Sequence, residues 1–320
     1  MALPRYRAEK TKVAELSACV LHDDVKDFHA TWLVGAGMLG ASLTHRDEEL
    51  LWQGAGAGTY ANERKFMGVP FLHPWANRLD RFGYQANGHE VELDPSSPLL
   101  LLDDNGLPIH GLLTASRAWS LQKLAADEES ASMTAALAFD RSELLRAFPF
   151  QHRVEIEIHL DEGGMSVATT VTPTGEEAVP IAFGFHPYLR MPGLPRAEWT
   201  VSFPVRRRLL LDSKGIPTGA TEPVEPIHGA IGDRTWDDGF DRIDTPARFE
   251  IHAGRRTTAL EYTDGYPVAQ IFAPPGQDYI CVEPMTAPTN ALNSPDGGFY
   301  SLPAGERFSA TFRIVSLVES

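Results

Sequence analysis

The stretch "HRVEIEIHLDEGGMSVATTVTP", residues 152–173, alternates apolar and polar side chains on both sides of a polar, glycine-containing turn. Alternation of this period is typical of half-buried β-strands, and "DEGG" at 161–164 supplies the turn between them. A second pair of strand-like segments, "AWSLQKL" and "SMTAALAF", flanks the polar "AADEESA". The sequence therefore predicts antiparallel hairpins as its basic unit.

The rest of the chain continues this pattern. Its 27 glycines and 24 prolines recur at short intervals, and helical periodicity is confined to residues 141–150, where Pro149 ends one short helical turn. This rhythm predicts an all-β fold, a large antiparallel β-sandwich. Residues 212–236 are rich in proline and glycine and weakly periodic, so we expect a long connection there. No low-complexity linker interrupts the chain, which predicts a single domain over residues 1–320.

Composition narrows the class of partner. The chain has 320 residues, 43% hydrophobic and 22% charged, which is ordinary for a soluble globular protein. A formal net charge of −15 disfavours nucleic acid and anionic membranes, so we expect a small-molecule partner. Cys19 and Cys281 are too few for a disulfide framework and are expected to be free thiols. The sequence shows no apolar leader and no stretch of ~18 apolar residues, which predicts a cytoplasmic protein. A monomer and a homodimer remain equally open.

Two loop segments combine polar groups with a constrained backbone. "GVPFLHPWANRLDRFGYQANG" (68–88) contains Trp75 and Tyr84, which offer flat apolar faces, and Arg78, which carries a five-donor fork. Sugars are bound by such mixtures, although for this segment taken alone an arginine that ties two loops together is the favoured interpretation of Arg78. In "LPIHGLLTASRAW" (107–119), His110 precedes Gly111, a residue that permits a sharp turn or a close approach to a ligand.

Three further segments carry titratable side chains, two of them at ends of strands and one in a pattern that is also typical of a turn. His186 stands between aromatic residues and prolines in "FGFHPYLRMP" (183–192), and imidazole is an acid or base near neutral pH. Glu283 ends an apolar run in "YICVEPMTAPTNALN" (279–293), where burial is expected to raise its pKa, unless it pairs with a buried arginine. "RTWDDGFDRI" (234–243) places Asp237 and Asp238 beside aromatic side chains.

Other catalytic patterns are missing from the sequence. It contains no HExxH, GxSxG or P-loop motif and no GxGxxG that opens a helix, and its eleven histidines lack metal-ligand spacing. We therefore expect neither a metal nor another cofactor. Acid–base chemistry on a small polar substrate is the interpretation that remains.

Read in order, five segments resemble the aldose 1-epimerase (galactose mutarotase-like) family: "PWANRLDRFGY", "IHG", "FGFHPYLRMP", "WDDGF" and "VEPMTAPTNALN", within residues 68–293. The resemblance implies a large antiparallel β-sandwich (the galactose mutarotase-like supersandwich) and an enzyme that interconverts the anomers of a free aldohexose. It implies His186 as the general acid and Glu283 as the general base. Glu283 would take the proton of the C1 hydroxyl while His186 protonates the ring oxygen O5, and neither step needs a metal or a nucleotide.

The same resemblance implies residues that hold the sugar. Arg78, His110 and Asp237 match the family's hydroxyl-binding positions, with Asp238 as the alternative because the doubled acid leaves the register ambiguous. Trp75 and Tyr188 are expected to supply aromatic contacts.

Some residues and some functions stay unassigned. His73 is interpreted as a packing residue rather than a ligand. Arg206, Arg207 and Arg208 either bind a phosphate or sulfonate or, as strand alternation favours, form a solvated or ion-paired strand. A hexose-6-phosphate 1-epimerase, a non-catalytic carbohydrate-binding domain and, last, a glycosidase with Asp237 and Glu283 as its carboxylates remain alternatives. The sequence does not specify which sugar is bound.

Overall fold

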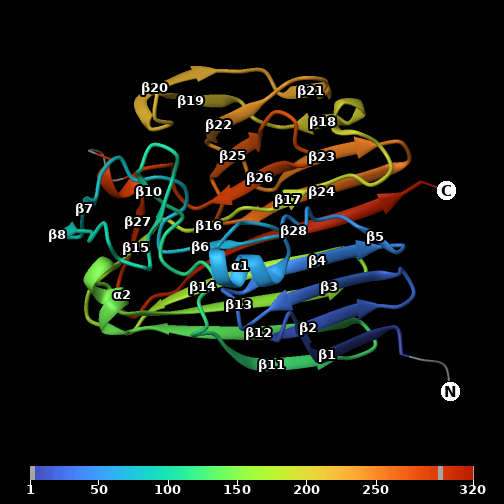
Figure 1. Cartoon of the computed structure of the whole chain (residues 1–320), viewed down its shortest axis with the longest axis horizontal. Helices are drawn as coiled ribbons and strands as arrows, with labels where there is room; N and C mark the ends of the chain where they lie inside the picture. The colour runs from blue at the N-terminus through green and yellow to red at the C-terminus, as the bar shows by residue number, and fades with distance from the viewer. Residues whose placement is uncertain (1–3, 295–297, 320) are drawn as a thin grey trace.

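The computed structural model describes residues 4–294 and 298–319, and these form layered antiparallel sheets (Figure 1). The largest sheet has nine strands in the spatial order β11 (Ser120–Ala126), β12 (Ser130–Phe139), β13 (His152–Asp161), β14 (Gly164–Pro173), β28 (Phe308–Val318), β24 (Arg256–Asp264), β23 (Ala247–Ala253), β18 (Thr200–Phe203) and β21 (Ile227–Ala230). Its strand β28 lies between the earlier strand β14 and the later strand β24, and it joins the two halves of the sheet.

Two further sheets pack on this one. The first has five strands, β1 (Tyr6–Val13), β2 (Leu16–Asp23), β3 (Phe28–Leu33), β4 (Leu39–His45) and β5 (Glu48–Glu49). The second has eight strands, β20 (Pro217–Pro223), β19 (Arg207–Leu211), β22 (Trp236–Asp241), β25 (Val268–Ala273), β26 (Ile280–Met285), β16 (Gly184–Phe185), β6 (Phe71–Leu72) and, beside β26, β17 (Tyr188–Leu189).

Minor elements complete the described part of the chain. Three two-stranded sheets pair β7 (Gly83–Ala86) with β8 (His89–Glu92), β9 (Leu101–Leu102) with β10 (Pro108–Ile109), and β15 (Val179–Ile181) with β27 (Tyr300–Leu302). The helices are short: α1 (Ala57–Glu63), α2 (Ser142–Ala147) and the 3₁₀ turns η1 (Arg196–Glu198) and η2 (Ala291–Asn293). The predicted all-β antiparallel fold is confirmed.

The main hydrophobic core lies between the layers and draws residues from Tyr6 to Ile314. Trp32 of β3 reaches across to Met165 of β14, and Phe185 of β16 meets Phe312 of β28 with ring centroids 5.0 Å apart. The alternating burial of β13 and β14 follows directly from their sequence, because every second side chain enters this core. Cys19 and Cys281 are both buried and free, as expected.

The predicted hairpins and the predicted helical turn are confirmed. Strands β13 and β14 pair through the turn at 161–164, β11 and β12 pair in the same way, and α2 ends before Pro149. The long connection expected at 212–236 is wrong, since the segment contains strands β20 and β21. Both lie at the edge of a sheet and are mostly exposed, so no core-facing side marks them in the sequence.

The search for a helix long and apolar enough to cross a membrane found none among residues 4–294 and 298–319.

Two loops beside the eight-stranded sheet are fastened to each other. The amide of His110 donates to Asn77 O, and the amide of Leu112 donates to His73 O. Gly111 has a φ of +69°, and a Cβ there would lie 2.3 Å from His73 O, so only glycine allows this approach. The pairing sets Arg78 and His110 side by side at the end of the sheet that also holds β16 and β26.

Candidate active site

The centre of the candidate site is a contact between His186 and Glu283. Glu283 lies in the fully buried strand β26, and His186 occupies the break between β16 and β17, where Pro187 lacks the N–H that would continue the ladder. The amide of His186 donates to Pro70 O, which holds the break in place. His186 Nε2 lies 3.2 Å from Glu283 Oε1, with the side chains 7% and 2% exposed.

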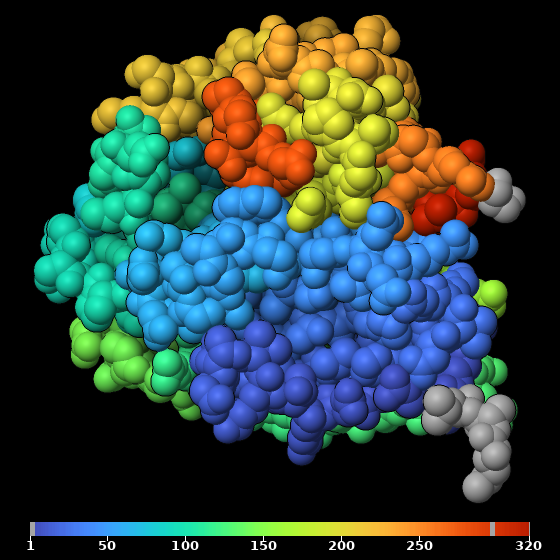
Figure 2. Space-filling view, turned by 45° about the vertical axis from the view of Figure 1, so that its right-hand side comes forward, coloured from blue at the N-terminus to red at the C-terminus, as the bar shows by residue number. Residues whose placement is uncertain are grey.

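Aromatic rings enclose His186. Tyr188 stacks on its imidazole with centroids 4.4 Å apart and planes at 13°, while His110 meets it edge-on at 5.4 Å. Phe66 and Phe272 also present edges at about 6 Å. The imidazole is thus held in one orientation by contacts on several sides. Figure 2 shows the surface hollowed where the segments coloured teal, gold and orange-red meet.

A series of polar contacts extends from the neighbourhood of Glu283 to Asp103. Gln270 of β25 lies directly across from Glu283 in the strand ladder, and its Nε2 donates to Asp237 Oδ1 over 2.7 Å. Asp237 Oδ2 lies 3.6 Å from an Arg78 guanidinium nitrogen, and Arg78 Nε donates to Asp103 Oδ2 over 2.7 Å. Asp103 in turn accepts the amide of Leu107, so this carboxylate anchors both its own turn and the guanidinium.

The structure distinguishes the two adjacent aspartates. Asp237 shares hydrogen bonds and charge with Gln270 and Arg78, whereas Asp238 points to Arg208, with Oδ1 3.4 Å from its guanidinium. Alternation along β22 sends the two carboxylates to opposite sides. Of the pair, Asp237 is the one grouped with the predicted site residues.

Burial sets the electrostatics of the central pair. Desolvation, with a smaller contribution from the charge of Arg78, lowers the pKa of His186 to about 3, because both disfavour the imidazolium. Desolvation raises the pKa of Glu283 well above its usual range, Asp237 adds to the rise and Arg78 opposes it. Burial thus favours neutral forms of both groups, which together hold one transferable proton.

Several polar atoms at this place have no protein partner. Among the described residues, no hydrogen bond reaches the buried atoms His110 Nδ1, His186 Nδ1 or Glu283 Oε2. Buried polar atoms are nearly always paired in folded proteins, so three unpaired atoms on neighbouring side chains indicate a place for a polar ligand. Tyr188, Arg78, His110 and Asp237, all predicted from the sequence, belong to the same group of contacts.

Trp75 does not belong to this group. Its ring is 1% exposed, lies in the main core and packs against Tyr84, whose hydroxyl donates to Ala147 O. The structure does not support the predicted sugar contact for Trp75, because the indole face is covered by the protein's own core.

His73 is a packing residue, as interpreted from the sequence. It is 2% exposed, stacks on Phe71, and its Nε2 lies 2.7 Å from His152 Nε2. Arg207 and Arg208 form the ion-paired strand that alternation favours, since Arg207 pairs with Asp241 and Arg208 pairs with Glu222 and Asp238. Arg206 precedes the strand and is exposed.

Sequence reasoning missed Gln270, Asp103, Phe66 and Phe272. A signal exists for Gln270, which is the polar residue of the apolar strand "VAQIFA" and is 3% exposed. Asp103 stands in an ordinary polar turn and has no signal of its own, because its role comes from Arg78 in a distant segment.

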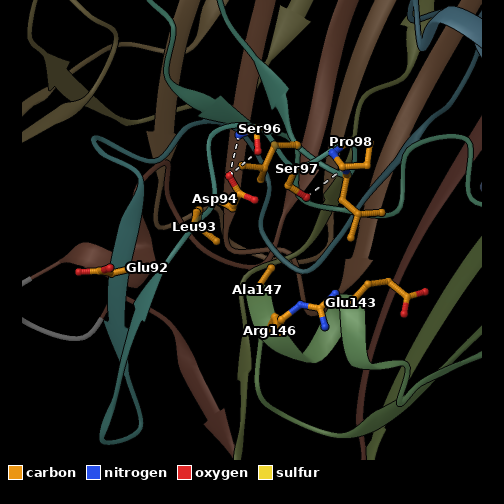
Figure 3. Close-up of a pocket in the computed structure, with 11 residues that line it drawn as sticks. Glu92, Leu93, Asp94, Ser96, Ser97, Pro98, Glu143, Arg146 and Ala147 are labelled. Carbon is orange, nitrogen blue, oxygen red and sulfur yellow. Dashed lines mark hydrogen bonds between the residues drawn. The ribbon is translucent and has the colours of Figure 1, made fainter.

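A pocket elsewhere on the surface has a volume of about 580 Å³ and lies between α2 and the chain after β8 (Figure 3). The figure shows Ser96 bonded to Asp94 within it, and Glu92 and Glu143 add further acidic groups. None of the predicted site residues lines this pocket, so it is separate from the candidate active site.

Comparison with known proteins identifies a family. The model of the aldose 1-epimerase family matches residues 30–315. A curated relative, the uncharacterized protein YihR of Escherichia coli, is 28% identical over 286 residues and aligns over 84% of each chain.

Solved structures agree with the fold. A galactose mutarotase-like protein from Clostridium acetobutylicum superposes with a TM-score of 0.85 at 17% identity, over 98% of this chain and 99% of that one. A galactose 1-epimerase from Lactobacillus acidophilus superposes with a TM-score of 0.78 at 16% identity, over 99% and 100% of the two chains. The galactose mutarotase-like sandwich expected from the sequence is confirmed.

Proposed function

Because the chain belongs to the aldose 1-epimerase family, we propose that it interconverts the α and β anomers of a free aldohexose by opening and closing the pyranose ring. The observation that carries this proposal is the buried His186–Glu283 contact, with unpaired polar atoms on His186, Glu283 and the adjoining His110. A ring hydroxyl and a ring oxygen supply the partners that such atoms lack.

In the proposed reaction the substrate takes the place of the direct contact. Glu283 accepts the proton of the C1 hydroxyl and His186 donates a proton to O5, so that the C1–O5 bond breaks and a C1 aldehyde forms. Rotation about C1–C2 and the reverse transfers close the ring on the other face. Each residue regains its starting protonation state, and acid–base assistance of this kind contributes about 10²–10⁴-fold.

The cycle needs the charged form of the pair at its start, whereas burial favours the neutral form, so the proton of Glu283 must first move to His186. Ring opening converts an imidazolium and a carboxylate into a neutral imidazole and a carboxylic acid, and burial favours these neutral forms. The two forms differ only in the position of one proton across the 3.2 Å contact. The buried surroundings therefore stabilise the pair in the state that accompanies the open-chain sugar.

The neighbouring polar groups would orient the sugar. Arg78 donates to hydroxyls while Asp103 holds its guanidinium, and Asp237 accepts from a hydroxyl while Gln270 holds its carboxylate. His110 offers its unpaired Nδ1, and Tyr188 keeps the imidazole of His186 in place by stacking. A guanidinium that Asp103 already holds in place loses little entropy when it binds.

The arginines favour an unphosphorylated sugar over a phosphorylated one. A phosphate needs cationic groups that are free to bind it, whereas Arg207 and Arg208 are paired with carboxylates of the same sheet.

The test is polarimetry on freshly dissolved α-D-glucose and α-D-galactose, with wild type and Glu283→Gln measured side by side. We expect the wild type to accelerate the change in rotation of at least one sugar and the variant to lose that acceleration while retaining its circular dichroism spectrum. A wild type that accelerates neither sugar contradicts the free-aldohexose proposal. An active Glu283→Gln protein would remove Glu283 from the role of base.

A further inference from the structure

A second polar cluster lies on the five-stranded sheet, away from the sheet that holds Glu283. His22 of β2 and His29 of β3 are directly opposite in the strand ladder, and both occupy the half-exposed face. The turn that joins the two strands contributes Asp24. One ligand atom from each of these three side chains lies within 4.8 Å of the other two. A hairpin thus brings two imidazoles and a carboxylate together.

The orientation of the imidazoles is the unusual feature. His22 Nδ1 and His29 Nδ1 face each other at 3.0 Å. The other ring nitrogens face carboxylates: His29 Nε2 lies 3.0 Å from Asp27 Oδ1, and His22 Nε2 lies 3.4 Å from Glu9 Oε1. The second contact lacks the alignment of a hydrogen bond, and His22 Nε2 is shielded from solvent.

When both imidazoles are neutral, one of the contacts described above always brings lone pairs together. Asp27 places the proton of His29 on Nε2, so His29 Nδ1 carries a lone pair. If His22 also carries its proton on Nε2, two lone pairs face each other at 3.0 Å. If His22 carries it on Nδ1, the lone pair on Nε2 faces the carboxylate of Glu9. A cation between the two Nδ1 atoms removes both conflicts.

Contrary to the expectation drawn from the spacing of the histidines, we propose that His22 Nδ1, His29 Nδ1 and a carboxylate oxygen of Asp24 form a zinc-binding site, with water as the fourth ligand. Two imidazoles and one carboxylate are an ordinary zinc donor set, and bonds of about 2.0–2.1 Å in tetrahedral geometry place two nitrogens roughly 3.3 Å apart. The observed 3.0 Å requires only a small adjustment. Asp27 and Glu9 then act as the carboxylates that orient the ligating histidines.

Arg7 is compatible with this site. It donates to both oxygens of Asp24, over 2.6 and 3.0 Å. An ionised carboxylate has about four acceptor positions, so Asp24 can bind the metal with one oxygen while it keeps the guanidinium. Because Arg7 belongs to β1, the bound metal would fasten the β2–β3 hairpin to the strand beside it.

The test is isothermal titration of the chelator-treated full-length protein with zinc chloride near pH 7.5, together with thermal unfolding at each zinc concentration. We expect one saturable equivalent of zinc per chain and a melting temperature that rises with zinc. His29→Gln should abolish both effects, and Asp27→Asn should weaken binding roughly 10–100-fold. His89→Gln is the matched control, because His89 is another half-exposed histidine beside a carboxylate, Glu177.

The proposal is overturned if the wild type binds no zinc, or if the His29→Gln variant binds zinc as tightly as the wild type does. If the His29→Gln variant fails to fold, Asp24→Asn tests the site instead. Asp24 lies in the surface turn, so we expect this variant to fold. Unchanged affinity in Asp24→Asn contradicts the proposed ligand set. Zinc binding is independent of the proposed epimerase activity, so the two proposals fail separately.

Discussion

Two pairs of buried titratable side chains differ in how completely they are paired. In the core pair, His73 Nε2 meets His152 Nε2 at 2.7 Å and His152 Nδ1 meets Phe150 O at 2.6 Å, so that three of the four ring nitrogens are used. In the site pair, His186 touches Glu283, yet each side chain keeps one buried polar atom without a partner in the described chain. Both pairs lie among aromatic rings, so burial alone does not separate them.

This difference in pairing predicts which pair stabilises the fold and which pair takes part in catalysis. The core pair leaves only His73 Nδ1 without a partner, so we expect it to contribute mainly to the stability of the fold. In the site pair both side chains keep an unpaired buried atom, which raises the free energy of the pair until a ligand binds. We therefore expect changes in the core pair to affect stability and changes in the site pair to affect turnover.

The largest expected effect follows from His186→Asn. Removing the proposed acid should lower kcat by about 10²–10⁴-fold, because asparagine cannot protonate O5. The fold should persist, since the smaller polar side chain fits the same space. Initial rates from polarimetry and a thermal melt of the same sample measure both quantities. Turnover close to that of the wild type would show that His186 is not the acid.

The core pair should respond in the opposite way. His152→Leu leaves His73 Nε2 and Phe150 O without their partner, which should cost about 1–3 kcal/mol in the free energy of unfolding. Urea unfolding measures the loss, and kcat of the folded protein should stay close to that of the wild type. A large fall in kcat with unchanged stability would reverse the comparison.

The remaining prediction concerns the pH dependence of stability. Burial lowers the pKa of His152 to about 4 and that of His73 well below its usual value. The unfolded histidines titrate near 6.5 and bind protons that the folded ones do not, so stability falls as pH drops from about 6.5 towards 4. Each such histidine contributes up to about 1.4 kcal/mol per pH unit.

Urea unfolding of wild type and His152→Leu at pH 7, 6 and 5 checks this dependence. The variant should show the shallower dependence, because one proton-linked group is gone. Identical dependence in the two proteins would mean that His152 titrates alike in the folded and unfolded states.

The fold was predictable wherever one face of a strand enters the core. Residues 152–173 alternate because β13 and β14 bury every second side chain. Strands β20 and β21 were not predictable, since an exposed edge strand needs no apolar face.

The candidate site was predictable where its residues stand next to local backbone constraints. His186 precedes Pro187 and Glu283 precedes Pro284, so both segments are recognisable in isolation. Gln270 was not, because its position across from Glu283 depends on strand register. Trp75 was misplaced because the sequence of a loop does not show whether its indole faces inward or outward. The catalytic and binding roles themselves stay predictions.

The central position of β28 has a consequence for how the protein folds. This strand pairs with β14 on one side and with β24 on the other. It follows both of them in the sequence and is the last strand of the described chain. Until its residues are available, the nine-stranded sheet consists of two pieces without a common hydrogen-bond ladder. Pairing of such distant segments has a large entropic cost of loop closure, and proteins dominated by such pairings fold slowly. Cooperative assembly of this sheet therefore awaits the C-terminal strand.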